Sequence, residues 1–281
     1  MECHLERITV HYEAFGEGRS LFMLPGWPDP WQVPADYLEP LFGDRPGWRR
    51  VYLDLPGRGA TRGAPWIQSN DDVLAVILGV IDRLAPAERF VVGGQSAGAY
   101  LARAVLRRRF ERVDGLLQVV PVIHATEVAD ALPAAVTIHR DPILVARIAA
   151  EFGPDMAEGF ASKIVMQTEP VYERIRGLVP SFQGHDAAFL AMLAAHDELS
   201  FDVDAGPKPF LRPALFVLGR QDAVTGYASA LGLMNAYPRA SMTVLDSAGH
   251  ALPWEQPQLF AALAAEWLDR IKRESGDIGE H

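Results

Sequence analysis

The sequence predicts an α/β protein: a mostly parallel β-sheet with helices on both faces and a helical cap inserted into the core. Short apolar runs that end at Gly or Pro alternate with longer amphipathic stretches along most of the chain. This alternation stops between residues 122 and 206, where helix-like stretches follow one another without a clear strand. We therefore predict a first part of the core at residues 1–121, the cap at 122–206 and a second part of the core at 207–281.

The predicted strands are apolar runs short enough to be buried within a sheet. They lie at residues 20–24, 50–55, 90–92, 115–120, 214–218 and 242–245. Residues 7–14 alternate polar and apolar side chains, which indicates an antiparallel strand or hairpin at the sheet edge. Helical spacing predicts helices over 70–84, with Asn70 as N-cap, and over 254–272. Helix-like stretches of the cap lie at 142–152, 169–178 and 186–199.

Charge and composition exclude several classes of partner. The 281 residues, 49% of them apolar and 22% charged, are enough for one large core and an inserted subdomain. With 26 basic and 36 acidic residues the formal net charge is −10, so no basic surface is available for nucleic acid or an anionic membrane. We expect a small-molecule substrate, and neither a nucleic-acid nor a membrane partner.

The hydropathy pattern of the sequence shows no targeting signal. The longest aliphatic run, residues 73–81, is too short to cross a bilayer, and residues 1–15 lack the apolar core of a signal peptide. The single cysteine, Cys3, allows no internal disulfide, which fits a reducing compartment. We expect a cytoplasmic location.

The strongest catalytic motif is Gly-Gln-Ser-Ala-Gly at residues 94–98, between a predicted strand and a helical stretch. A serine at the apex of a tight strand-to-helix turn has a strained backbone, and the flanking glycines let strand and helix approach each other. The start of the helix also offers free N–H groups that stabilise negative charge on a bound carbonyl oxygen. We therefore predict that Ser96 is a nucleophile.

A serine nucleophile needs a base, and histidine suits this role because its unperturbed pKa is about 6.5. His250 follows the last predicted strand, so its loop opens at the same sheet edge as Ser96. Asp222 follows the strand at 214–218 and is the predicted acceptor that holds the imidazole in one tautomer. Asp246 is the alternative acid, but it precedes His250 by only four residues, and an aspartate that close more often stabilises the turn.

Nucleotide and metal chemistry lack the residues they require. A dinucleotide-binding turn needs a second glycine at position 95, where the chain has Gln. The sequence contains no phosphate-binding loop, no H-E-x-x-H motif and no two histidines at metal-ligand spacing. We expect neither a cofactor nor a metal.

Five motifs follow one another in a recognisable order. They are Leu-Pro-Gly-Trp-Pro at 24–28, Asp-Leu-Pro-Gly-Arg-Gly at 54–59, the serine motif at 94–98, Gly-Arg-Gln-Asp at 219–222 and G-H-x-x-x-x-E-x-P at 249–257. Together with the chain order Ser, Asp, His, they resemble the α/β-hydrolase family over nearly the whole core. The resemblance implies an eight-stranded sheet, a cap inserted after the sixth strand, and an oxyanion hole formed by the backbone N–H groups of Trp27 and Ala97.

Two positions depart from the common family pattern, since Pro25 and Arg58 stand where many relatives have histidine. Neither change touches the two expected oxyanion donors, the backbone N–H groups of Trp27 and Ala97. The family's epoxide hydrolases and haloalkane dehalogenases carry aspartate at the serine position, so Ser96 favours acyl transfer. Trp27 and Leu252 adjoin the expected oxyanion donor and base, and we expect both to contact substrate.

The favoured function is a serine hydrolase that cleaves a small or medium, fairly hydrophobic carboxylic ester or lactone through an acyl-enzyme on Ser96. A carbon–carbon bond hydrolase of the ring-cleavage-product type would use the same triad. Its acidic substrate would need a cation, whereas the cap segment carries 13 acidic and 5 basic residues. A third alternative is a slow-turnover ligand receptor on the same fold, which predicts weak turnover and a ligand-dependent change in the cap.

Overall fold

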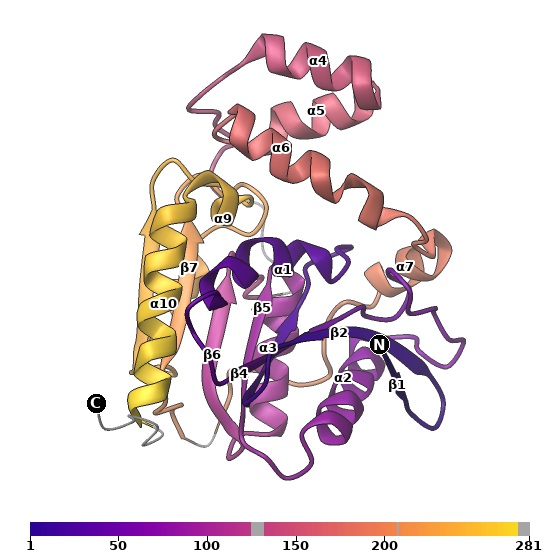
Figure 1. Ribbon diagram of the computed structural model, residues 1–281, viewed down its shortest axis with the longest axis vertical. Coiled ribbons are helices and arrows are strands. Elements are labelled where there is room, and N and C mark those ends of the chain that lie inside the picture. Colours follow the sequence, from indigo (N-terminus) through magenta and orange to yellow (C-terminus); the bar gives the residue numbers. More distant parts are fainter. Residues whose placement is uncertain (125–131, 207, 275–281) are drawn as a thin grey trace.

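An eight-stranded sheet forms the centre of the protein, with the strand order β1-β2-β4-β3-β5-β6-β7-β8 (Figure 1). The computed structural model describes residues 1–124, 132–206 and 208–274. The strands are β1 (Glu2–His4), β2 (Thr9–Phe15), β3 (Arg19–Leu24), β4 (Trp48–Leu53), β5 (Phe90–Gln95), β6 (Val113–Val119), β7 (Ala214–Gly219) and β8 (Ala240–Leu245). The pairs β1–β2 and β2–β4 are antiparallel and the later pairs are parallel. The predicted mostly parallel sheet with an antiparallel edge is confirmed.

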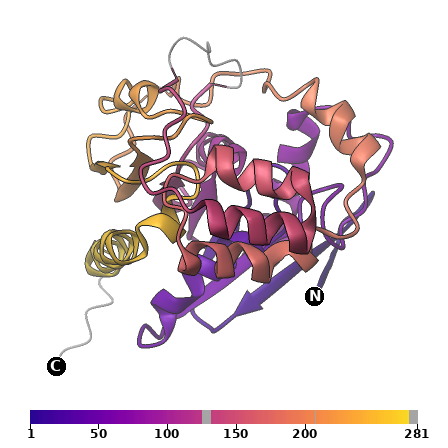
Figure 2. The same cartoon turned by 90° about the horizontal axis from the view of Figure 1, so that it is seen from above.

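Helices cover both faces of this sheet (Figures 1 and 2). Their bounds are α1 (Gln32–Leu38), η1 (Glu39–Phe42), α2 (Asn70–Leu84), α3 (Ala97–Arg108), α8 (Ala228–Leu231), α9 (Leu252–Glu255) and α10 (Pro257–Glu274). Helices α2 and α3 pack on one face, and α1 and α10 pack on the other. Among the residues that the structure describes, no helix is both long enough and apolar enough to span a membrane.

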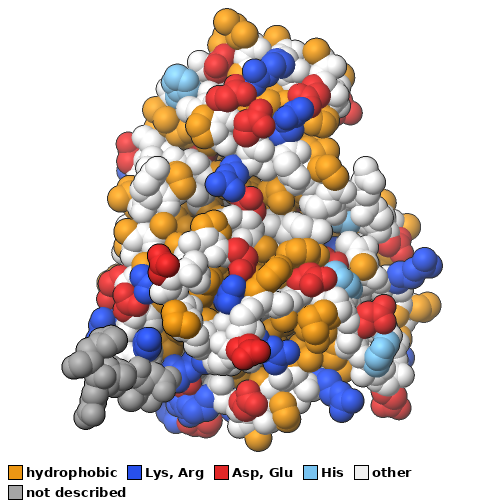
Figure 3. Space-filling model, in the orientation of Figure 1, with side chains coloured by type: hydrophobic (Ala, Val, Ile, Leu, Met, Phe, Trp, Pro, Cys, Tyr) orange, Lys and Arg blue, Asp and Glu red, His pale blue; other side chains and the backbone are white. Residues whose placement is uncertain are grey.

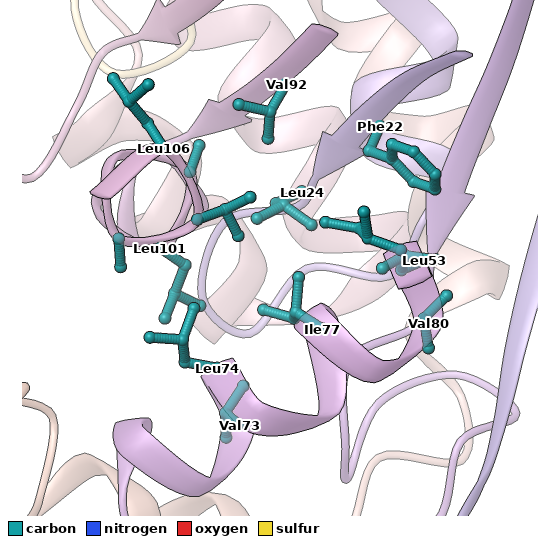
Figure 4. Close-up of a cluster of buried hydrophobic side chains, with 14 of the residues drawn as sticks. Phe22, Leu24, Leu53, Val73, Leu74, Ile77, Val80, Val92, Leu101 and Leu106 are labelled. Carbon is teal, nitrogen blue, oxygen red and sulfur yellow. The ribbon is translucent and has the colours of Figure 1, made fainter. Parts of the chain in front are cut away.

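Alternation along the strands divides the core between the two faces. In β3, Phe22 and Leu24 point to the cluster under α2 and α3, whereas Leu21 and Met23 point to the cluster under α1 and α10. Figure 4 shows the first cluster, where Ile77 of α2 lies near Leu24. Each buried side chain of this kind stabilises the fold by roughly 1.5–3 kcal/mol. Because both faces are covered, an uninterrupted apolar run such as β3 is the expected sequence for a central strand.

Helices α4 to α7 occupy the chain between β6 and β7. They are α4 (Pro142–Phe152), α5 (Pro154–Lys163), α6 (Glu169–Leu178) and α7 (Ala187–Ala194), with the short helix η3 (Val179–Phe182) between the last two. Figure 2 shows α4, α5 and α6 side by side, and they share a small apolar cluster that also includes Ala251 beside α9. Residues 125–131, residue 207 and residues 275–281 lie outside the described residues. The division into cap 122–206 and core 1–121 plus 207–281 stays a prediction.

Ion pairs offset part of the negative charge of this helical segment. Arg147 lies 2.5 Å from Glu169, and Arg176 lies 2.6 Å from Glu151. Figure 3 shows acidic and basic side chains next to one another on the surface of this helical segment, at the top of the view. At such exposed positions solvent screens an ion pair and it stabilises the fold very little, so these contacts do not explain how the segment is attached to the core.

The helix ends differ from the prediction in three places. Helix α2 is capped by Ser69 rather than Asn70, in a capping box with Asp72. The helix predicted over 254–272 is two helices, α9 and α10, which break at Gln256 because a following proline has no N–H to continue the first helix. Helix α7 is shorter than the predicted stretch 186–199, and α5 was not predicted.

A buried arginine joins the core to both ends of the helical segment. The Arg103 side chain of α3 is fully buried, and its Nε donates to the Asp204 carboxylate at 3.1 Å. Nη1 donates to Gln118 Oε1 at 2.9 Å, and Nη2 donates to the Ile123 carbonyl at 2.7 Å. A buried guanidinium is tolerated only when its donors are satisfied in this way. Arg103 therefore couples β6, the start of the segment and its end.

Replacing Arg103 by Ala should lower the free energy of unfolding by about 3–5 kcal/mol, because it removes the buried donors of Asp204 Oδ2 and Gln118 Oε1. Arg107→Ala is the matched control on the same helix, where the side chain is partly exposed. It should change the stability by less than about 0.5 kcal/mol. Urea unfolding followed by circular dichroism measures both variants. Equal losses in the two variants would contradict this role for Arg103.

Candidate active site

The predicted nucleophile lies in a sharp turn between β5 and α3. Ser96 has φ 54° and ψ −122°, a conformation that L side chains rarely adopt. A Cβ added to Gly94 would lie 2.1 Å from the Gly98 carbonyl oxygen. One added to Gly98 would lie 2.3 Å from the Pro25 carbonyl oxygen. Only glycine fits at either position, so the two glycines allow strand, helix and the loop after β3 to meet around Ser96.

Two backbone N–H groups near Ser96 are available to a bound oxyanion. Ala97 begins α3 and Trp27 lies in the loop after β3; within the described ranges, neither N–H donates to another group of the protein. The Ser96 backbone is itself held, because its N–H donates to the Val119 carbonyl at 2.9 Å and its carbonyl accepts from Val122 at 3.1 Å. The turn is thus fixed to β6 while both predicted oxyanion donors stay free.

The predicted acid and base are in contact. Asp222 is fully buried after β7, and its Oδ2 lies 2.9 Å from His250 Nδ1. Its Oδ1 accepts from the backbone N–H groups of Val224 at 2.9 Å and Thr225 at 3.1 Å. Asp222 therefore stabilises its own turn, as an aspartate after glycine often does, and also orients the imidazole.

The two groups shift each other's pKa in opposite directions. Burial acts most strongly on His250 and lowers its pKa, but the negative charges of Asp222 and Asp29 and the hydrogen bond that the imidazole donates to Asp222 outweigh it, so the pKa lies above 6.5. Burial likewise raises the pKa of Asp222, but His250 and the backbone N–H groups hold it below 3.8. Asp222 is therefore ionised at neutral pH, and His250 becomes neutral only above its raised pKa.

The alternative acid has a different role. Asp246 lies at the surface, and its Oδ1 accepts from Gln221 Nε2 at 2.8 Å. Its Oδ2 accepts from the Ser247 hydroxyl at 3.2 Å. In the part of the chain that the structure describes, Asp246 makes no contact with the His250 ring. It stabilises the turn.

Ser96 and His250 follow β5 and β8 at the same edge of the sheet. Among the described residues, no hydrogen bond joins the Ser96 hydroxyl to the His250 imidazole; catalytic hydrogen bonds often tighten only in the substrate complex. The two halves of the site are linked through Thr225, whose hydroxyl oxygen lies 2.8 Å from Asp222 Oδ2 and 3.2 Å from the Val120 carbonyl oxygen and donates its single proton to one of them at a time. Val120 lies in the segment that holds the Ser96 backbone, so the acid and the turn share one support.

Arg58 holds the loop that carries Trp27. Its Nη1 donates to the Gly26 carbonyl at 2.9 Å, and its guanidinium carbon lies 4.6 Å from the centroid of the Trp27 ring. The side chain is buried, and burial lowers its pKa to about 10. The residue pattern assigned this arginine no role, because its acceptor is a backbone carbonyl that is distant in sequence.

Glu255 joins the histidine loop to the helical segment. Its Oε2 accepts from the Gly249 N–H at 2.6 Å, and its Oε1 accepts from Val165 at 2.7 Å and Met166 at 3.3 Å. Burial raises the pKa of this carboxyl, and the three N–H groups act in the opposite direction. Because Gly249 precedes His250, Glu255 is a positioning residue for the imidazole. The predicted motif at 249–257 contained it, but only the fold reveals its partners.

Asp29 brings a further carboxylate to the site. A Cβ added to Gly26 would lie 2.6 Å from Asp29 Oδ2 and 3.3 Å from Ser96 Cβ, so both side chains approach the same point. Residue patterns alone gave no prediction for Asp29. The one available signal was its position directly after the motif at 24–28.

The two predicted substrate contacts have different settings. Trp27 is partly buried beside the serine turn. Leu252 is fully buried in the core under α1 and α10, so a substrate would reach it only if neighbouring side chains moved. Both contacts remain predictions. In the described ranges, no group of three or more His, Cys, Asp or Glu side chains is arranged to hold a metal ion.

Comparison with known proteins agrees with this architecture. The model of the alpha/beta hydrolase family matches residues 21–263. A relative from Pseudomonas putida, 2-hydroxy-6-oxononadienedioate/2-hydroxy-6-oxononatrienedioate hydrolase 2, is 26% identical over 93% of this chain and 92% of its own length. The pimeloyl-[acyl-carrier protein] methyl ester esterase of Aeromonas hydrophila is 27% identical over 93% of this chain and 100% of its own.

A solved structure shares the fold over nearly the whole chain. It is an alpha/beta superfamily hydrolase from Oenococcus oeni PSU-1, with a TM-score of 0.84 and 24% identity, and the match covers 97% of this chain and 99% of that one. The family match spans most of this sequence, including the serine turn and the His250 loop. The chain therefore belongs to the alpha/beta hydrolase family.

Proposed function

We propose that the protein is a serine hydrolase that cleaves a small or medium, fairly hydrophobic carboxylic ester or lactone. The observation that carries this proposal is the 2.9 Å contact between His250 Nδ1 and Asp222 Oδ2, at the sheet edge where Ser96 has its strained backbone. An imidazole whose Nδ1–H donates to a carboxylate presents Nε2 as a proton acceptor. The name of the Aeromonas relative, a methyl ester esterase, supports an ester substrate.

The proposed reaction uses each of these groups in turn. Ser96 Oγ attacks the scissile carbonyl carbon while His250 Nε2 takes its proton. The carbonyl oxygen becomes negatively charged and accepts hydrogen bonds from the N–H groups of Trp27 and Ala97, each worth about 3 kcal/mol in comparable sites. His250 then protonates the leaving alcohol, and a water molecule activated by the same imidazole hydrolyses the acyl-enzyme to the carboxylic acid and free Ser96.

Carbon–carbon bond hydrolysis is the second candidate. The name of the Pseudomonas putida relative, a dienedioate hydrolase, favours it. The same serine, histidine and aspartate would serve, so the two candidates differ in the bond that breaks and in the charge of the substrate. Substrate comparison distinguishes them better than mutation of the triad.

Replacing Ser96 by Ala should reduce ester turnover by roughly four to six orders of magnitude and abolish labelling by a fluorophosphonate, because the attacking oxygen is lost. Ser162→Ala, at an exposed position of α5, is the control and should keep both signals. The assay compares p-nitrophenyl esters of increasing acyl length with an acidic vinylogous diketone. A strong preference of the wild type for the diketone would favour the second candidate. Labelling of the alanine variant would contradict both.

Asp222→Asn should lower kcat by about 10⁴, because the amide cannot hold the imidazole in the required tautomer. Asp246→Asn changes the same atoms at the alternative acid and should lower kcat by less than about threefold, since Asp246 only stabilises the turn. Steady-state kinetics on one ester measures both. A reversed order of the two effects would move the acid role to Asp246.

The value of kcat/KM should fall as the pH decreases, with a midpoint above 6.5, because His250 must be neutral to accept the serine proton and its pKa is raised. The residual activity of Asp222→Asn should have a lower midpoint, because the charge and hydrogen bond that raise the pKa are removed. Rates between roughly pH 5 and 9, with samples returned to neutral pH to exclude unfolding, measure the midpoint. A wild-type midpoint below 6.5 would contradict the assignment of His250.

A further inference from the structure

We propose that the Asp29 carboxylate is a substrate-binding group that favours acyl substrates with an ammonium group on the carbon next to the scissile carbonyl, and disfavours those with a carboxylate there. This inference rests on the proposed esterase function and narrows its substrate class. It concerns the charge of the substrate next to the scissile carbonyl.

The position of Asp29 places its charge at the reacting centre. The loop after β3 turns back through the hydrogen bond from the Asp29 N–H to the Gly26 carbonyl at 3.0 Å. This turn directs Asp29 Oδ2 toward the place that a side chain on Gly26 would occupy. Ser96 Cβ lies close to the same place. Asp29 is close enough to His250 to raise the pKa of the imidazole. The carboxylate therefore lies between the predicted oxyanion loop, the nucleophile and the base.

No group of the described chain satisfies this carboxylate. Its oxygens accept no hydrogen bond there, and no cationic nitrogen lies within 4.0 Å of them, whereas Asp54 and Asp222 each accept several hydrogen bonds. The nearest arginine, Arg58, donates to the Gly26 carbonyl and stacks on Trp27. Burial raises the pKa of Asp29, and the charges of His250 and Arg58 only oppose this effect. An unpaired carboxylate in a partly buried wall is unfavourable unless a ligand pairs with it.

A structural role does not account for Asp29. Turn aspartates usually accept a hydrogen bond from a backbone N–H two or three residues further on, as Asp222 does from Val224 and Thr225. The Asp29 side chain makes no such bond in the described residues; only its backbone closes the turn. The remaining partner is one that arrives with the substrate, and a carboxylate beside a reacting carbonyl attracts an ammonium and repels a second carboxylate.

The test uses three ethyl esters that differ only in one substituent on the carbon next to the carbonyl. Ethyl propanoate carries hydrogen, alanine ethyl ester carries an amine and monoethyl methylmalonate carries a carboxylate. The kcat/KM of each is measured for the wild type, for Asp29→Asn and for Asp44→Asn, which removes the same charge from an exposed turn. The kcat/KM for alanine ethyl ester is divided by the kcat/KM for monoethyl methylmalonate, and this ratio is compared between the three proteins. Because the protonated fraction of the amine is the same in each assay, it does not affect the comparison.

Asp29→Asn should lower this ratio at least about tenfold, whereas Asp44→Asn should leave the ratio unchanged. An unchanged ratio in Asp29→Asn, with ethyl propanoate still hydrolysed, would overturn the proposal. Failure of the wild type to hydrolyse any ester, with Ser96 unlabelled by fluorophosphonate, would instead contradict the proposed function.

Thermal unfolding tests whether the Asp29 carboxylate is unpaired, and it needs no substrate. Because the folded-state pKa of Asp29 is raised, its charged form destabilises the fold above that pKa and the effect disappears below the unfolded value of about 3.9. Asp29→Asn should therefore raise Tm by a few degrees at about pH 8, and this gain should vanish near pH 4. A lower Tm of the variant at pH 8 would indicate that the protein itself pairs the carboxylate, and would overturn the proposal.

Discussion

The rest of the site depends on one backbone conformation, the positive φ of Ser96 between β5 and α3. This conformation is unfavourable by itself and persists because the surrounding packing holds it. The absence of side chains at Gly94 and Gly98 lets the helix start against the loop after β3, within van der Waals distance of its carbonyl oxygens. The same close approach leaves the N–H groups of Trp27 and Ala97 near the serine without an acceptor among the described residues. The strained serine backbone and the two free N–H groups thus have one geometric cause.

Three carboxylates around this turn illustrate how environment decides the role of one chemical group. Asp222 receives backbone and hydroxyl donors and the imidazole, so it stays ionised and orients the ring of His250. Glu255 receives three backbone N–H groups and connects the His250 loop to the helical segment. Asp29 receives no donor from the described chain and therefore keeps its full capacity for a ligand. The proposed chemistry and the proposed selectivity both follow from this distribution of hydrogen-bond donors.

Much of the fold could be predicted because local patterns were strong. Helix α2 has the predicted bounds 70–84, since its apolar stripe is long and regular, and β3 and β7 lie within one residue of the predicted runs. The errors lie at helix ends, where two neighbouring capping residues compete, as Ser69 and Asn70 do. Helix α5 escaped prediction because its apolar face is completed only by packing against other helices of the segment.

The sequence by itself determined the layer architecture, the serine turn and the order of the three predicted catalytic residues, because these depend on periodicity and on glycines that are close in sequence. Only the tertiary structure decided which aspartate meets His250 and which instead supports a turn. It also decided that Arg58 and Glu255 position loops and that Asp29 faces the nucleophile. The physical reason is that these roles are set by hydrogen bonds and charges between segments far apart in the chain, whose distances no local pattern encodes.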